Sequence, residues 1–224
     1  LLGDLGGEGS PLFFRNLGSD FAAGRRRGGR GQGLVRKDRF TTAKGRMAKI
    51  RALRRAASPG AHRIDVTGIR PAVGDGAEIT GFSDQEMYKH RSLALQTLAL
   101  PAGGGSRTAT LLANKGPTAH LAFAAAHRWT TPVWQAASLV AALVSQLPAL
   151  RRAWQSVQKA APSTWSAVRG PIGAAHRDLL RLQVSWDSPL ACTIGGKQVL
   201  LTATAPRLVR HLLWEQHHRL LATK

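Results

Sequence analysis

The sequence contains a single cysteine, Cys192, among its 224 residues. A lone thiol cannot form a disulfide within the chain, and it cannot supply the thiolate set of a structural zinc site. Eight histidines are present, but none forms a recognised metal-binding motif with an acid or a cysteine. We therefore expect no metal site and no cofactor in this chain. The cysteine content fits a reducing intracellular compartment, nuclear or cytoplasmic.

Acidic residues are scarce, with 12 Asp and Glu against 32 Lys and Arg. No two acids are adjacent, and the closest pair, Asp84 and Glu86, has the positions of helix-capping residues. The sequence also lacks a Gly-x-Ser-x-Gly nucleophile elbow and a Gly-Lys phosphate-binding loop. No catalytic residues are assigned to this chain for these reasons.

Long apolar runs are missing as well. The most apolar stretch, Ala136 to Val144, is interrupted by Ser138 and is far shorter than the ~20 residues that span a bilayer. The first ten residues, LLGDLGGEGS, have neither the basic region nor the apolar run of a secretory signal. We expect no transmembrane segment, no membrane partner and no secretion. Because the first residue is not Met, we also expect a fragment of a longer reading frame.

The chain has an excess of positive charge, a formal +20, and half of it lies near the N-terminus. Residues 1–60 hold fourteen Lys and Arg against four acids, a net charge of +10. Such an excess indicates an anionic partner, which is nucleic acid, an anionic membrane or an acidic protein. The segment Gly24 to Gly33, GRRRGGRGQG, is either an arginine-glycine arm that grips phosphates or a solvated linker.

Thr41 to Ala57 is predicted to form a basic amphipathic helix. Apolar residues recur every three or four positions from Ala43 onward and make one narrow stripe, while Lys and Arg cover the rest. The narrow stripe favours docking on a core, with the basic face turned toward a phosphate backbone. The candidate nucleic-acid-binding residues are Arg25, Arg26, Arg27, Arg30, Arg36, Lys37, Lys44, Arg46, Lys49, Arg51, Arg54 and Arg55.

A second helix is predicted to begin after Ser83. Ser83 and Glu86 have the Ser-x-x-Glu spacing of a capping box, and Asp84 adds negative charge at the positive end of the helix dipole. Apolar residues from Met87 to Leu98 follow at helical spacing. An ordinary amphipathic core helix is the preferred interpretation of this stretch.

The rest of the chain is also expected to be helical, with one helix starting at Pro148, except for a short extended piece from His62 to Ile69 and a region near the end. Short apolar runs on either side of Gly195-Gly196 predict a β-hairpin. Thr204 to Leu221 predicts a last helix with Thr204 as its cap and Leu208 on its buried face. The fold class is therefore mainly α, a helical bundle-like layer with a disordered basic N-terminal arm and a small C-terminal hairpin. The expected domains are an arm over 1–40, a helical domain over 41–161 and a helix–hairpin–helix unit over 162–224.

Three short runs carry a resemblance to a known family. They are Pro71-Ala72, Gly76-Ala77-Glu78-Ile79 and Gly81-Phe82-Ser83-Asp84. Together they resemble a signature downstream of the polymerase palm in reverse-transcriptase-like retroelement polyproteins, although Asp75 stands where that family usually has Tyr. A run from Asn16 to Gly24 resembles the segment that precedes this region in the same family.

The resemblance implies an accessory, thumb-like region that holds a template–primer duplex by its phosphates without reading sequence. The partner would be RNA or an RNA–DNA duplex. The catalytic aspartates and their Mg²⁺ would belong to a palm upstream of Leu1 in a parent RNA-directed DNA polymerase. Two alternatives stay open, a stand-alone basic RNA-binding or ribosome-associated protein and a non-functional product of a decayed element.

Overall fold

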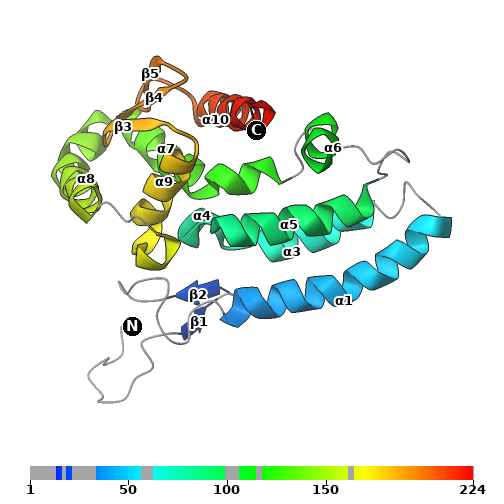
Figure 1. The fold of residues 1–224 in the computed structure, drawn as a ribbon. Coiled ribbons are helices and arrows are strands. Elements are labelled where there is room, and N and C mark those ends of the chain that lie inside the picture. The colour runs from blue at the N-terminus through cyan, green and yellow to red at the C-terminus, as the bar shows by residue number, and fades with distance from the viewer. Residues whose placement is uncertain are drawn as a thin grey trace, which may run out of the picture.

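The computed structural model describes residues 14–16, 19–21, 34–56, 63–98, 106–114, 118–160 and 164–223. The fold is mainly helical, as Figure 1 shows, and a small antiparallel sheet lies near the C-terminus. In the same view the long helix α1 (Leu34–Ala56) runs alongside α3 (Arg70–Gly74) and α5 (Asp84–Thr97). The mainly α fold class predicted from the sequence is thus confirmed.

Shorter elements surround these helices in the first half of the chain. The strands β1 (Phe14–Asn16) and β2 (Ser19–Phe21) pair antiparallel ahead of α1. A π-helix, η1 (Asp65–Ile69), continues directly into α3. The single turn α4 (Ala77–Thr80) precedes α5, and α6 (Arg107–Ala113) follows it.

The second half begins with a 3₁₀ turn, η2 (Ala119–Phe123), which leads into α7 (Ala124–Ala137). The helix α8 (Val140–Ala160) follows, then the 3₁₀ turn η3 (Trp165–Ala167) and α9 (Gly170–Arg181). The α7 and α9 helices pack against each other over much of their length. They form the helical layer on which the C-terminal sheet and the last helix rest.

The C-terminal sheet has the order β3–β4–β5, with β3 (Ser185–Ser188), β4 (Ala191–Ile194) and β5 (Lys197–Leu200). The predicted hairpin is confirmed as β4–β5, and its turn residues Gly195 and Gly196 have φ of 57° and 81°. Two consecutive positive φ values are those of a type I′ turn, which glycine adopts without steric cost. The strand β3 was not predicted from the sequence.

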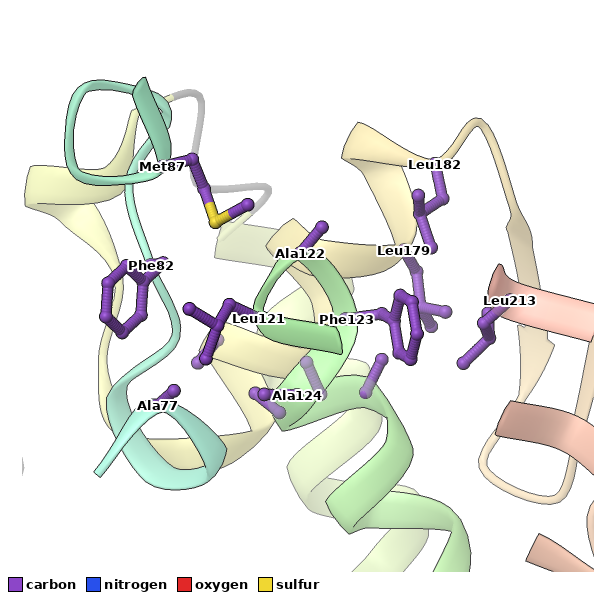
Figure 2. Packing of buried hydrophobic residues seen from close by; sticks show 14 of the residues in the cluster. Ala77, Phe82, Met87, Leu121, Ala122, Phe123, Ala124, Leu179, Leu182 and Leu213 are labelled. Atoms are coloured by element: carbon purple, nitrogen blue, oxygen red, sulfur yellow. The ribbon is translucent and has the colours of Figure 1, made fainter. Parts of the chain in front are cut away.

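One hydrophobic cluster runs through the molecule. Figure 2 shows Leu121 of η2 pointing toward Phe82, and Phe123 pointing the other way, toward Leu179 and Leu213. Phe82 and Phe123 are fully buried, and burying such a side chain stabilises a fold by ~1.5–3 kcal/mol. The short η2 segment therefore joins the half of the core around α5 to the half around α9 and the last helix.

The same hydrophobic cluster crosses the boundary that was expected between the second and third domains. It includes Phe40 of α1 and Leu213 of the last helix, so it contains side chains from both sides of the expected boundary at 161/162. Of the arm expected over 1–40, the structure describes β1, β2 and the start of α1. The helix begins at Leu34 rather than at Thr41 because Phe40, which is buried, extends its apolar stripe toward the N-terminus. The Gly24 to Gly33 segment lies outside the described residues.

The capping box at the start of α5 is confirmed. The backbone N–H of Glu86 donates to Ser83 Oγ at 3.3 Å, and the Ser83 N–H donates to Glu86 Oε2 at 2.7 Å. Two N–H groups that the first helical turn cannot pair are satisfied in this way. The start of α5 is therefore fixed by local chemistry that the sequence displays.

Two helix boundaries differ from the prediction at proline and threonine residues. A helix was expected to start at Pro148, but α8 continues through it. Pro148 and Val144 are both exposed, so the carbonyl that the proline leaves unpaired faces solvent rather than the core.

The last helix, α10 (Pro206–Ala222), starts after Ala205 and has no side-chain cap, so Thr204 is not its cap. Leu208, expected to be buried on this helix, is 52% exposed because Val209 and Leu213 face the core instead.

The extended piece expected between His62 and Ile69 is also wrong, since the structure has η1 there. The Arg70 N–H donates to the Asp65 carbonyl, the five-residue spacing of a π-helix. The side chains of the same two residues form a buried ion pair, with Arg70 Nε 2.6 Å from Asp65 Oδ2. Thr97 of α5 donates to the same carboxylate oxygen at 3.0 Å. A tertiary contact thus contributes to holding this segment helical.

Candidate nucleic-acid interface

The α1 helix presents two chemically different faces. Phe40, Ala43, Met47 and Ile50 recur at helical spacing and are buried against the elements that α1 packs on. The opposite side is exposed, and it carries only Lys, Arg and small or polar residues near its middle. Docking of the apolar stripe on a core, as expected from the sequence, leaves this basic side in solvent.

Five candidate residues are exposed on α1, and we call them the basic face. Lys37, Lys44 and Arg51 form one row along one flank of the buried stripe. Successive members of this row are seven positions apart, so they stand ~10.5 Å apart along the helix. Arg46 and Lys49 lie on the other side of the helix, and Arg46 is next to the η1–α3 segment. The basic face consists of Lys37, Lys44, Arg46, Lys49 and Arg51.

The remaining candidates divide into two groups. Arg54 and Arg55 belong to the last turns of α1, where only the backbone is described. The four arm arginines lie outside the described residues, so their assignment stays a prediction. They are Arg25, Arg26, Arg27 and Arg30.

Arg36 is a candidate that the structure places differently. It is 9% exposed, and its Nη1 donates to the Gly81 carbonyl at 2.8 Å and to Glu86 Oε1 at 3.2 Å. Its Nη2 donates to Thr80 Oγ1, and its guanidinium lies 4.5 Å from the centre of the Phe82 ring. This arginine is occupied by the α4–α5 connection, so its assignment as a phosphate-binding residue is wrong.

Arg39 contributes an interaction that the sequence analysis missed. Its Nη2 lies 2.6 Å from Asp75 Oδ2, and its Nη1 donates to the Asp75 carbonyl at 3.0 Å. Two contacts to one residue fix the plane of the guanidinium. No local signal links positions 39 and 75, because the pairing depends on how α1 packs beside α3.

A groove lies beside the basic face, between α1 and the η1–α3 segment. Its volume is about 250 Å³. The buried side chains of Ala43, Ile69 and Val73 form its floor, and Arg39 and Arg46 stand at its rim. The groove therefore combines an apolar floor with an edge that carries two arginines and one acid, Asp38.

A second arginine holds the residues that carry the family resemblance. Arg181 of α9 donates to the Phe82 carbonyl, and its Nε lies 2.9 Å from Asp84 Oδ1. Gly81 has φ of 63°, and a Cβ atom there would lie 2.5 Å from Trp165 Cζ3. Between them, Arg36 and Arg181 fix the backbone of this turn from α1 and from α9. The Gly81-Phe82-Ser83-Asp84 run thus has a structural explanation that requires no ligand.

Another buried acid supports the helical layer. Asp178 of α9 is fully buried and accepts from the backbone N–H of Ala125 at 3.0 Å and of Ala126 at 3.4 Å. Those amides belong to the first turn of α7, which has no side-chain cap of its own. A carboxylate at the positive end of the helix dipole stabilises the helix start. Asp178 is therefore a capping group supplied from a distant part of the chain.

The titratable groups do not assemble a metal centre in the described ranges. There, no cluster of three or more His, Cys, Asp or Glu side chains has the arrangement of a metal site. Burial, together with the nearby His120 and Arg70, lowers the pKa of His90 to about 4. Burial also raises the pKa of the Cys192 thiol to about 12, which leaves it protonated and unreactive.

Comparison of this chain with protein-family models, with curated proteins and with solved structures finds no match. The resemblance to reverse-transcriptase-like polyproteins therefore stays a prediction from the quoted residues. Among the helices that the structure describes, none combines the length and the apolar character needed to cross a bilayer.

Proposed function

We propose that this chain is the nucleic-acid-binding, thumb-like accessory region of a reverse-transcriptase-like retroelement protein. In this proposal the basic face of α1 holds an RNA or RNA–DNA duplex by its phosphates. The observation that carries the proposal is the exposure of Lys37, Lys44 and Arg51 in one row, along one flank of the buried stripe of the same helix. The polymerase chemistry, and the Mg²⁺ that it requires, belong to the palm of such a protein.

The charge of α1 supports a phosphate partner. The helix carries nine Lys and Arg against one acid, Asp38. Arg36 and Arg39 are paired with Glu86 and Asp75, and the remaining cations give the helix a positive field. The row from Lys37 to Arg51 covers fourteen positions, or ~21 Å. A row of cations of this length can contact several phosphates along a strand, and such contacts position a protein without selecting sequence.

The residues that carry the resemblance support the proposal indirectly. Gly81 and Glu86 accept hydrogen bonds from Arg36 of α1, so this turn fixes the start of the helix that bears the basic face. A recognition helix needs such support, because a phosphate-binding row is effective only when the side chains are held on a rigid element.

The salt dependence of binding tests the proposal. Substitution of Lys37, Lys44 and Arg51 by Gln should weaken binding to a labelled RNA–DNA hybrid in fluorescence anisotropy. It should also flatten the slope of log affinity against log salt by up to about 2.7, because each lost phosphate contact removes about 0.9. The matched control is Gln at Arg151, Arg152 and Lys159, which are exposed on α8 and remove the same charge.

The salt slopes of these variants distinguish binding by the basic face of α1 from binding by α8. If the control lowers the slope as much as the α1 variant does, binding depends on net charge alone and the basic face is not the interface. If only the control lowers it, the interface lies on α8. A further variant with Gln at Arg25, Arg26, Arg27 and Arg30 tests the arm, and we expect it to flatten the slope by up to about 3.6.

A further inference from the structure

The groove between α1 and the η1–α3 segment differs from the basic face because its floor is apolar. Its floor is formed by Ala43, Ile69 and Val73, which are 3%, 4% and 1% exposed. Phosphate groups gain nothing from an apolar floor, so charge alone does not account for this surface. The groove is suited to a ligand with a flat apolar face and an anionic group beside it.

Two arginines at the rim of the groove can contact both the flat face and the anionic group of such a ligand. Arg39 and Arg46 are seven residues apart on α1, so they stand ~10.5 Å apart along the helix axis. Arg39 is fixed by its two contacts to Asp75, at 2.6 and 3.0 Å, which orient its guanidinium plane. Nucleobases stack on arginine planes of this kind. Arg46 is exposed at the other end, one turn before Lys49 of the basic face.

The size of the groove narrows the choice of ligand. At about 250 Å³ it is smaller than the ~300–1,000 Å³ of pockets that enclose drug-sized ligands. A groove of this volume can hold one nucleobase but is too small for a dinucleotide cofactor. A base within a duplex has both faces stacked on its neighbours, so only an unpaired base is available to enter.

We propose that the groove receives one unpaired base of a single-stranded nucleic acid, against Ala43, Ile69 and Val73, with the adjoining phosphate at Arg46. The inference rests on the proposed function, because it places a single-stranded overhang on the Arg46 side of the helix whose other flank, the row Lys37, Lys44 and Arg51, holds the duplex. Arg39 then stacks on the base, and Lys49 meets the next phosphate along the strand.

Filling the groove tests the inference. Ala72 lines the groove and is exposed at its edge, so Ala72→Phe adds a ring there without changing the charge. We expect this variant to bind a labelled single-stranded oligonucleotide at least about fivefold more weakly, the low end for loss of one stacked base. Its affinity for a blunt duplex should stay within about twofold of wild type. The control is Ala109→Phe, which adds the same ring to an exposed position on α6.

A second measurement does not depend on any variant. A single strand that carries 4-thiouridine is crosslinked to the wild-type chain by light, and the attached peptides are identified by mass spectrometry. We expect attachment to peptides that contain residues 38–46 or 69–73. Attachment only elsewhere overturns the inference, even where Ala72→Phe does not fold.

The remaining outcomes distinguish the two proposals. If the wild type binds neither single strand nor duplex, the proposed function fails and the inference falls with it. If the wild type binds both ligands while Ala72→Phe leaves the two affinities unchanged or lowers them by the same factor, the groove is not a base site. In that case the proposed function stands. A fluorescent fatty acid and a Glu-rich peptide are tested in the same way. If one of them binds Ala72→Phe more weakly than wild type while the single strand binds both proteins equally, the groove is the site of that ligand and the inference is wrong.

Discussion

Arg36 and Glu86 join the start of α1 to the start of α5. Arg36 Nη1 donates to Glu86 Oε1 at 3.2 Å, while the other oxygen of the same carboxylate accepts from the Ser83 N–H. One glutamate therefore closes a capping box and holds a neighbouring helix. The contact also places the basic face of α1, which begins at the next residue, Lys37.

Replacement of Arg36 should destabilise the fold rather than weaken phosphate binding. Arg36→Met removes hydrogen bonds from a charged, largely buried donor, and each such bond is worth ~1.5–3 kcal/mol. We expect a loss of at least ~1.5 kcal/mol in the free energy of unfolding, measured by denaturant titration. Lys37→Met, one residue along on the exposed face, should change it by less than ~0.5 kcal/mol. Equal losses in the two variants would contradict the structural role of Arg36.

The capping box predicts a difference between two serines of the same helix. Ser83→Ala leaves the Glu86 N–H without its partner and should cost ~0.5–2 kcal/mol. Ser92 lies inside α5, where a serine hydroxyl has no capping role, so Ser92→Ala should be nearly neutral. Thermal unfolding of both variants provides the measurement. A larger loss for Ser92→Ala would mean that capping does not fix the start of α5.

Gly81 and Gly170 differ in the space around them. Their φ values are 63° and 62°, so alanine is strained at either position. The strain is larger at Gly81, because its ψ of −179° puts it in a region that is essentially restricted to glycine. A Cβ at Gly81 would lie 2.5 Å from Trp165, whereas nothing lies within 4 Å of one at Gly170. Because overpacking in a core costs a further ~1–3 kcal/mol, we expect Gly81→Ala to lose more stability than Gly170→Ala by at least that amount.

A double variant isolates the steric part. Trp165→Leu shortens the side chain that the new Cβ would meet, so Gly81→Ala should cost less in that background than in the wild type. Denaturant titration of the four proteins in the cycle gives the coupling free energy. A coupling of zero would assign the whole effect of Gly81→Ala to its φ.

Elements with local signals were predictable from the sequence. The capping box at Ser83 and the turn at Gly195-Gly196 both act over a few residues, and both were found where expected. The burial of Met47 followed from its place in a periodic stripe. In each case the side chain and its partner lie close together in the chain, so spacing carries the information.

Features that depend on distant partners were not predictable. The spacing from Arg36 to Glu86 is 50 residues and that from Asp178 to Ala125 is 53. A basic residue within a basic segment gives no sign that one of its neighbours will be buried on an acid from another helix. The error at Arg36 follows from this, as does the failure to foresee the groove beside Arg39.

The residue His90 predicts a particular dependence of stability on pH. Its ring is 2% exposed, lies edge-on to Phe40 and Phe82, and has no hydrogen-bond partner for either nitrogen among the described residues. Burial, with the positive charges of His120 and Arg70, lowers its pKa from 6.5 to about 4. Arg70 is in turn paired with Asp65, which offsets part of its positive charge, so burial is the main reason that the neutral imidazole is favoured.

The sign of the effect follows from proton linkage. Between pH 6.5 and 4 the unfolded chain binds a proton at His90 that the folded chain does not bind, so stability falls as the pH falls. A shift of this size corresponds to about 3 kcal/mol in total, at about 1.4 kcal/mol per pH unit, and the loss ends below pH 4. In His90→Leu this contribution is absent, while the acids and the other histidines titrate as before. Denaturant titration from pH 7.5 to 4 should therefore show the wild type losing about 3 kcal/mol more than the variant. Parallel curves would mean that His90 is protonated in the folded protein or hydrated there.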